Sequence, residues 1–139
     1  MERDAPRLRK ILTRNDIGTT GSHQAGIHVP KSVLAHFPKL DPTRLNPDRW
    51  IDVESDHGSF RWRLIHYNNR VTGGTRDEYR LTHIRDFLVQ AGASPGDILE
   101  FLRTGRGAYT CRIIDADRGV DELVLSTNGP WRVVAIRRG

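Results

Sequence analysis

The feature of this chain that most restricts its fold is a polar segment from residue 15 to residue 26, which reads Asn-Asp-Ile-Gly-Thr-Thr-Gly-Ser-His-Gln-Ala-Gly. Strand-like runs flank it, at Leu8–Thr13 and at Ile27–Val29. Twelve residues are too many for a tight hairpin turn. The glycines permit positive φ and close approach of the backbone to a partner, and nearly all the side chains donate or accept hydrogen bonds. The segment is therefore either a binding loop on a β scaffold or an ordinary polar surface loop.

The rest of the chain has the pattern of a mainly β domain. Short runs of alternating apolar residues, of which Phe60–Tyr67 is the clearest, predict about seven strands. Near Tyr67 the alternation changes phase, which predicts a bulge. Two short helices are expected, one after Pro30 and one that Thr82 caps and Gly92 closes. These elements predict a barrel or sandwich with helical plugs.

Length and composition are those of one globular domain with a real core, over residues 1–139. No apolar run approaches the roughly 18 residues that a membrane span needs, and no signal peptide is visible. The single cysteine, Cys111, excludes an internal disulfide framework and suits a reducing cytoplasm.

The charge of the chain indicates a polyanionic partner. The net charge is +5, and 19 of the 22 basic residues are arginine. Arginine binds phosphates and guanine edges with two parallel hydrogen bonds, which lysine does not do. A GC-rich genome, which favours arginine codons, also accounts for such a bias.

A second long polar segment, residues 68–81, is another candidate binding element. If Thr75–Leu81 is extended, Arg76, Glu78 and Arg80 lie on one face of the strand. An arginine can bridge guanine O6 and N7, and a glutamate can accept a hydrogen bond from cytosine N4, so this face suits a G·C step. The alternative is the charged edge strand of a hairpin.

Catalytic and metal-binding patterns are incomplete. One cysteine cannot complete a thiolate zinc site, the histidines lack zinc-ligand spacing, and no phosphate-binding Gly-x-x-x-x-Gly-Lys motif is present. Glu78-Tyr79-Arg80 has the spacing of a nuclease Glu-x-Lys strand, but arginine stands where lysine is needed. We expect no catalytic or metal site, and a compact metal-dependent nuclease that uses Asp77 and Glu78 remains an alternative.

Several ordered motifs resemble the N-terminal effector-binding domain of EcoRII-type restriction endonucleases. The resemblance extends over residues 8–85 approximately. It rests on the segment from Asn15 to Pro30, on Leu45-Asn46-Pro47, on Ile65-His66-Tyr67-Asn68-Asn69-Arg70 and on Thr75-Arg76-Asp77-Glu78-Tyr79-Arg80. The sequence departs from the family pattern at Gly74 and Tyr79, where basic residues are expected.

The resemblance implies a B3-like DNA-binding pseudobarrel of about seven strands with two short helices. Two arms would grip the major groove, an N-terminal arm at Asn15–Gly26 and a C-terminal arm at Asn69–Arg80. Domains of this family bind double-stranded DNA at a short GC-flanked site of the CCWGG type and do not cut it. A separate nuclease domain would need Mg²⁺, whereas binding needs no cofactor. The chain would thus be an excised, monomeric domain of a longer restriction endonuclease in the cytoplasm of a prokaryotic cell, without membrane contact.

The combined interpretation assigns two groups of DNA-contacting residues. The base-reading residues are Thr20, Ser22, His23, Gln24, Arg76, Asp77, Glu78 and Arg80. The DNA-backbone contacts are Arg9, Lys10, Arg14, Asn15, Arg61, Arg63, Asn69, Arg70 and Thr75, and such contacts position a protein without specifying sequence. A stand-alone transcription regulator of plant B3 type is a further alternative.

Overall fold

The computed structural model describes residues 6–18, 26–115 and 122–136. Its strands are β1 (Arg7–Ile11), β2 (Ile27–Val29), β3 (Asp48–Ser55), β4 (Gly58–Tyr67), β5 (Glu78–Thr82), β6 (Ile98–Gly105), β7 (Ala108–Ile114), β8 (Glu122–Asn128) and β9 (Trp131–Ile136). The α-helices are α1 (Arg14–Ile17) and α2 (Arg85–Gln90), and the 3-10 helices are η1 (Lys31–His36) and η2 (Asn69–Thr72).

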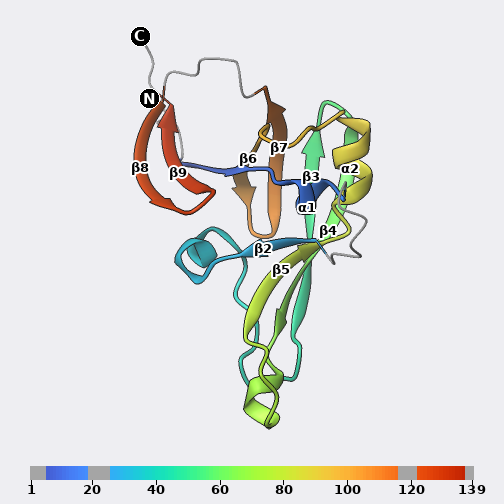
Figure 1. Cartoon of the computed structure of the whole chain (residues 1–139), viewed down its shortest axis with the longest axis vertical. Helices are drawn as coiled ribbons and strands as arrows, with labels where there is room; N and C mark the ends of the chain where they lie inside the picture. The colour runs from blue at the N-terminus through green and yellow to red at the C-terminus, as the bar shows by residue number, and fades with distance from the viewer. Residues whose placement is uncertain (1–5, 19–25, 116–121, 137–139) are drawn as a thin grey trace.

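The nine strands in the described part of the chain belong to one curled sheet, in the order β2-β5-β4-β3-β7-β6-β1-β9-β8 (Figure 1). Neighbouring strands are antiparallel except for β3 and β7, which run parallel. The sheet therefore has nine strands rather than the predicted seven or so, while its mainly β class agrees with the sequence.

Aromatic side chains from distant elements form the centre of the core. Trp62 of β4 packs edge-on against Phe101 of β6, with ring centroids 5.7 Å apart, and Phe87 of α2 lies 5.5 Å from Trp62. Tyr109 of β7 and Trp131 of β9 are buried in the same cluster. The sequence predicted a barrel or sandwich with helical plugs, and the structure is a curled half-barrel into which α2 inserts its apolar residues Phe87 and Leu88.

Three local expectations were wrong. Thr13 and Asp16 form a capping box, which turns the start of the predicted loop into α1. Thr82 does not cap α2: it belongs to β5, and its hydroxyl donates to the Arg63 carbonyl at 3.3 Å. No bulge occurs near Tyr67, because β4 and β5 pair in unbroken register there.

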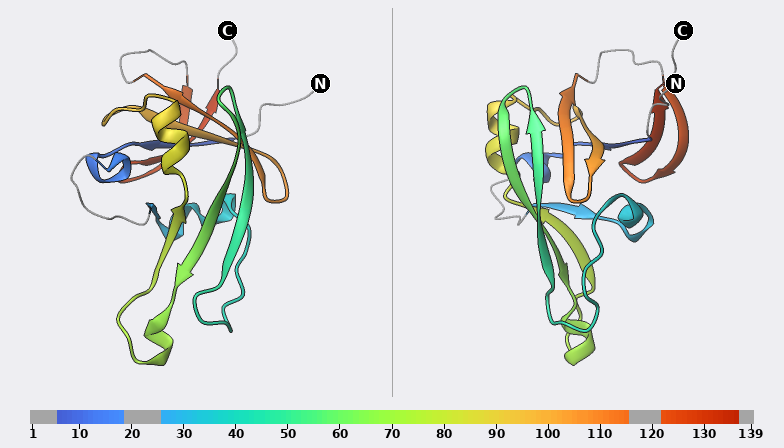
Figure 2. Two further views of the ribbon diagram at one scale, coloured as in Figure 1. Left: turned by 90° about the vertical axis from the view of Figure 1, so that its right-hand side faces the viewer. Right: turned by 180° about the vertical axis from the view of Figure 1, so that it is seen from behind.

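The hairpin of β4 and β5 extends well beyond the core, with η2 at its tip (Figure 2). The change of apolar phase before Tyr67 has a different cause: Leu64 and Ile65 are both buried, so both sides of β4 are covered at that point. No helix in the described ranges is long and apolar enough to span a membrane.

Candidate nucleic-acid interface

The C-terminal arm is a closed loop at the tip of the β4–β5 hairpin. Asn69 holds it closed, because its side-chain oxygen accepts a hydrogen bond from the Arg76 N–H at 2.8 Å. The Asn69 carbonyl accepts another from the Gly74 N–H at 2.8 Å, and the Arg70 N–H donates to the Arg76 carbonyl at 3.1 Å. Asn69, predicted as a DNA-backbone contact, therefore also shapes the arm.

The side chains of Arg76, Glu78 and Arg80 lie together on one face of this arm, as the sequence predicted. Register places Glu78 opposite Tyr67 and Arg80 opposite Ile65, and alternate residues of a strand share a face. Arg76 Nη2 donates to Glu78 Oε1 at 2.6 Å, and Arg80 Nε donates to the same oxygen at 3.4 Å. The Arg76 guanidinium also lies over the Tyr67 ring, 3.8 Å from its centroid. Arg76, Glu78 and Arg80 thus meet in one cluster.

Glu78 is ionised at neutral pH in this cluster. The hydrogen bond from Arg76 lowers the pKa of Glu78 against a smaller opposing effect of burial, and the charge of Arg80 lowers it further. Both arginines bind Oε1, so no described residue occupies Oε2. An ionised carboxylate only accepts hydrogen bonds, and Oε2 is available as the acceptor.

Asp77 lies between these residues in sequence but bonds on the other side of the strand. Its Oδ1 is 2.8 Å from His66 Nε2, and its Oδ2 accepts a hydrogen bond from Lys31 Nζ at 2.7 Å. The hydrogen bonds from Lys31 and His66 lower the pKa of Asp77 to about 2. Both carboxylate oxygens of this predicted base reader are therefore engaged within the protein.

The N-terminal arm begins with α1. Thr13 and Asp16 cap this helix, and Lys10 forms an ion pair with Asp16. The exposed Arg14 and Asn15 lie in the helix, where both have further interactions within the protein. The predicted base readers of this arm, Thr20, Ser22, His23 and Gln24, lie outside the described residues.

The N-terminal arm ends at Gly26, in contact with the other arm. The Gly26 carbonyl accepts a hydrogen bond from Arg80 Nη1 at 3.2 Å. Gly26 has φ +92°, and a Cβ there would lie 1.8 Å from the Leu81 carbonyl oxygen. Only glycine fits this approach of the arm to β5.

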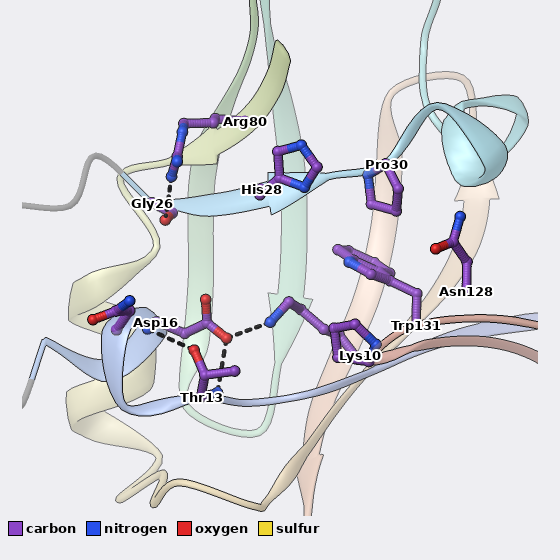
Figure 3. Close-up of a pocket in the computed structure, with 11 residues that line it drawn as sticks. Lys10, Thr13, Asp16, Gly26, His28, Pro30, Arg80, Asn128 and Trp131 are labelled. Atoms are coloured by element: carbon purple, nitrogen blue, oxygen red, sulfur yellow. Dashed lines mark hydrogen bonds and ion pairs between the residues drawn. The ribbon is translucent and has the colours of Figure 1, made fainter.

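A hollow of 310 Å³ lies between the base of the N-terminal arm and β2 (Figure 3). It is lined by Lys10, Thr13, Asn15, Asp16, Gly26, His28, Pro30, Arg80, Asn128, Pro130 and Trp131. His28 is a polar, exposed residue that the sequence analysis missed, and register places it opposite Arg80. The sequence contained a sign that His28 is exposed, because it lies between the apolar residues Ile27 and Val29 in a strand, and both of those are buried.

The cations predicted to contact DNA phosphates divide into two groups. Arg61 and Arg70 are exposed and Arg63 is one-third exposed; Arg61 and Arg63 pair with Asp52 and Asp48, respectively. Thr75 is exposed as well. Arg9 and Lys10, in contrast, are only 2% and 3% exposed. Their assignment as phosphate contacts was wrong, because their charges are used in ion pairs with Glu100 and Asp16.

The structure accounts for both departures from the family pattern. A Cβ at Gly74 would lie 2.5 Å from Asn69 Cγ, and the side chain of Asn69 is fixed by its bond to the Arg76 N–H. Tyr79 stacks on His66 with ring centroids 4.0 Å apart and planes 6° apart. A small residue and an aromatic residue thus suit the packing around this arm.

Within residues 6–18, 26–115 and 122–136, no group of three or more His, Cys, Asp or Glu side chains could hold a metal ion. The only cysteine, Cys111, is buried, and burial raises its pKa to about 12. The Asp77 and Glu78 carboxylates, considered above as a nuclease pair, are engaged by cations on different sides of the strand.

Comparison with known proteins gives the family. The model of the family described as restriction endonuclease EcoRII, N-terminal, matches residues 2–103. The chain belongs to this family. A curated relative, the type II restriction enzyme EcoRII of Escherichia coli, is 40% identical over 78 residues. That match covers 52% of the chain but only 19% of the relative, so the chain corresponds to a small part of that enzyme.

Two solved structures have a similar fold. One is the Arabidopsis FUS3–DNA complex, with a TM-score of 0.59, 20% identity and coverage of 78% of this chain and 96% of that one. The other is the N-terminal domain of Helicobacter pylori LlaJI.R1, with a TM-score of 0.53, 14% identity and coverage of 81% and 83%. This similarity supports the B3-like fold that the sequence motifs predicted.

Proposed function

We propose that this domain binds double-stranded DNA through the major groove and reads a short GC-flanked site of the CCWGG type. The observation that carries the proposal is the cluster of Arg76, Glu78 and Arg80 on one face of the projecting arm. Arginine and glutamate are the side chains that recognise guanine and cytosine edges. Family membership supports the proposal, as does the fold shared with a protein in a DNA complex.

Within this proposal, Glu78 distinguishes recognition of bases from sequence-independent binding to the DNA backbone. DNA phosphates repel a carboxylate, so Glu78 favours binding only where Oε2 meets a donor such as cytosine N4. The exposed or half-exposed cations Arg61, Arg63 and Arg70 contact phosphates instead, at any sequence.

The test compares Glu78→Ala with Arg63→Ala in titrations of a CCWGG-type duplex and of a scrambled duplex at one salt concentration. Loss of a good base contact costs ~1–3 kcal/mol, or roughly five- to a hundredfold in discrimination. We expect Glu78→Ala to lose affinity for the specific duplex and to keep or raise its affinity for the scrambled one. Arg63→Ala should weaken both similarly. If Glu78→Ala retains the full ratio, the proposed reading face is wrong.

We also propose that the domain binds DNA as a monomer, without a cofactor and without cutting it. The cutting activity and its Mg²⁺ belong to a separate nuclease domain of a longer, cytoplasmic restriction endonuclease. Specific binding should persist in a chelator, and plasmid incubated with Mg²⁺ should stay uncut. Cleavage that disappears in Glu78→Ala would instead support the compact-nuclease alternative. A native reading frame with no nuclease domain would support a transcription regulator.

A further inference from the structure

Asp77 occupies an unexpected place beside the proposed reading face. Its two chain neighbours, Arg76 and Glu78, bond to each other on one side of the arm. Its own carboxylate bonds on the other side, to His66 Nε2 at 2.8 Å and to Lys31 Nζ at 2.7 Å. Arg70 adds a more distant positive charge at 3.9 Å from Oδ2.

These contacts join three separate segments of the chain. His66 lies near the end of β4, Asp77 directly precedes β5, and Lys31 begins η1, immediately after β2 and Pro30. His66 is itself fixed, because its ring stacks on Tyr79 and only 13% of its side chain is exposed. The carboxylate therefore has two anchors that do not belong to the arm's tip.

We propose that Asp77 is a positioning residue for DNA recognition and does not itself read a base. The Lys31–Asp77–His66 contacts hold the backbone between Arg76 and Glu78 against β4 and η1. The two flanking side chains are then presented on the opposite face in a fixed orientation. This inference rests on the proposed function, and it replaces the base-reading role that the sequence suggested for Asp77.

Two physical arguments favour positioning over reading. Lys31 and His66 hold the carboxylate on the side of the strand away from Arg76 and Glu78, so a base contact beside those residues would require Asp77 to turn away from its charge-assisted hydrogen bonds, which are the stronger kind. A second carboxylate aimed at the DNA beside Glu78 would also add repulsion from the phosphates. Preorganised side chains lose less entropy on binding, so a fixed arm increases specific affinity.

The test uses the whole domain and four variants: Asp77→Asn, Asp77→Ala, His66→Gln and Lys31→Met. Each is titrated with the specific duplex, a scrambled duplex and a panel of specific duplexes with single base-pair changes. Thermal unfolding confirms that each variant is folded. Asp77→Asn is the mild variant, because it keeps one acceptor oxygen, and His66→Gln weakens the same cluster without changing Asp77.

Asp77→Ala should lose about two- to tenfold in specific affinity, because the Lys31 side chain is exposed and an exposed ion pair contributes little, with little change for scrambled DNA. Its discrimination should weaken at the base pairs that Glu78→Ala or Arg76→Ala affects and at no others. The double variant Asp77→Ala with His66→Gln should bind the specific duplex with nearly the same affinity as Asp77→Ala alone, since both substitutions disrupt the same cluster of contacts. A purely structural role would lower the melting temperature without this base-pair pattern.

Three outcomes would overturn the inference. The first is lost discrimination at a base pair that Glu78→Ala and Arg76→Ala both leave unchanged, with effects that add to those of His66→Gln. That result would identify Asp77 as a direct reader of a base. The second is full specificity in Asp77→Ala. The third is a lower melting temperature with unchanged discrimination. Failure of the proposed function is distinct, because the unchanged domain would then show no preference for the specific duplex.

Discussion

Glu100 offers the sharpest test of how this arginine-rich chain uses its charges. It is 2% exposed, and the register places Arg9 of β1 and Arg112 of β7 opposite it on either side. Arg9 Nε donates to it at 2.7 Å, Arg112 Nε at 2.8 Å and Arg7 Nη1 at 3.0 Å. Three arginines thus surround one buried carboxylate.

The size of the effect of Glu100→Gln follows from the exposure of those arginines. The side chains of Arg7 and Arg112 are 24% and 53% exposed and can turn toward water, but that of Arg9 is 3% exposed and cannot. Removing one member of a buried ion pair costs ~3–5 kcal/mol. Because glutamine keeps one acceptor oxygen, we expect about 3 kcal/mol, or roughly a 10 °C lower melting temperature.

The pH dependence has a defined sign. Burial alone would raise the pKa of Glu100, but the hydrogen bonds from Arg112, Arg9 and Arg7 outweigh it, so the pKa lies below its ordinary value of 4.5. A carboxyl whose pKa is lower in the folded state stabilises that state above the unfolded pKa. This contribution is therefore complete above about pH 5 and is lost as the pH falls through the folded pKa.

The assay is urea denaturation at pH 7 and at pH 3–4. Glu54→Gln, at an exposed glutamate of β3, is the control and should stay within about 0.5 kcal/mol of the unchanged domain. The double variant Glu100→Met with Arg9→Met replaces both members of the buried pair with apolar side chains, so it should be more stable than Glu100→Gln. A loss below about 1 kcal/mol in Glu100→Gln, or equal stability of the double and single variants, would refute this reasoning.

Two further predictions concern the arms and the charged surface. Gly26→Ala should cost well over 2 kcal/mol in denaturation, because the strained φ of ~1–3 kcal/mol is combined with a Cβ 1.8 Å from a carbonyl oxygen. Gly58→Ala, at φ +110° with open space around it, isolates the strain, and an equal loss in both variants would contradict the clash. The logarithm of DNA affinity should fall with the logarithm of salt concentration with a slope of about −4. Of the six cations predicted to contact phosphates, Arg9 and Lys10 are buried, which leaves four. The four are Arg14, Arg61, Arg63 and Arg70. A slope near zero would mean that this surface does not bind DNA.

The sequence by itself determined the class of the fold and the place of the C-terminal arm. The alternation of apolar and polar residues along Phe60–Tyr67 reflects the two-residue period of a β-strand. This period is a property of the strand's own backbone and does not depend on which strand lies beside it. The same period predicted that Arg76, Glu78 and Arg80 share a face, and the structure confirms it. Helix ends were less predictable. Thr13 and Thr82 are both suitable N-cap residues, but only Thr13 caps a helix, because Thr82 is part of the paired strand β5.

Only the tertiary structure decided which charges face outward and which hold the domain together. Nothing local distinguishes Arg9 from Arg63, yet Arg9 meets Glu100, 91 positions away, and is only 2% exposed. Asp77 likewise meets Lys31, 46 positions away, and Arg80 meets Gly26, 54 positions away. Side-chain periodicity is a property of the local backbone, whereas the partner of a charge depends on which distant strands become neighbours, and that is set by the packing of the whole sheet around its core.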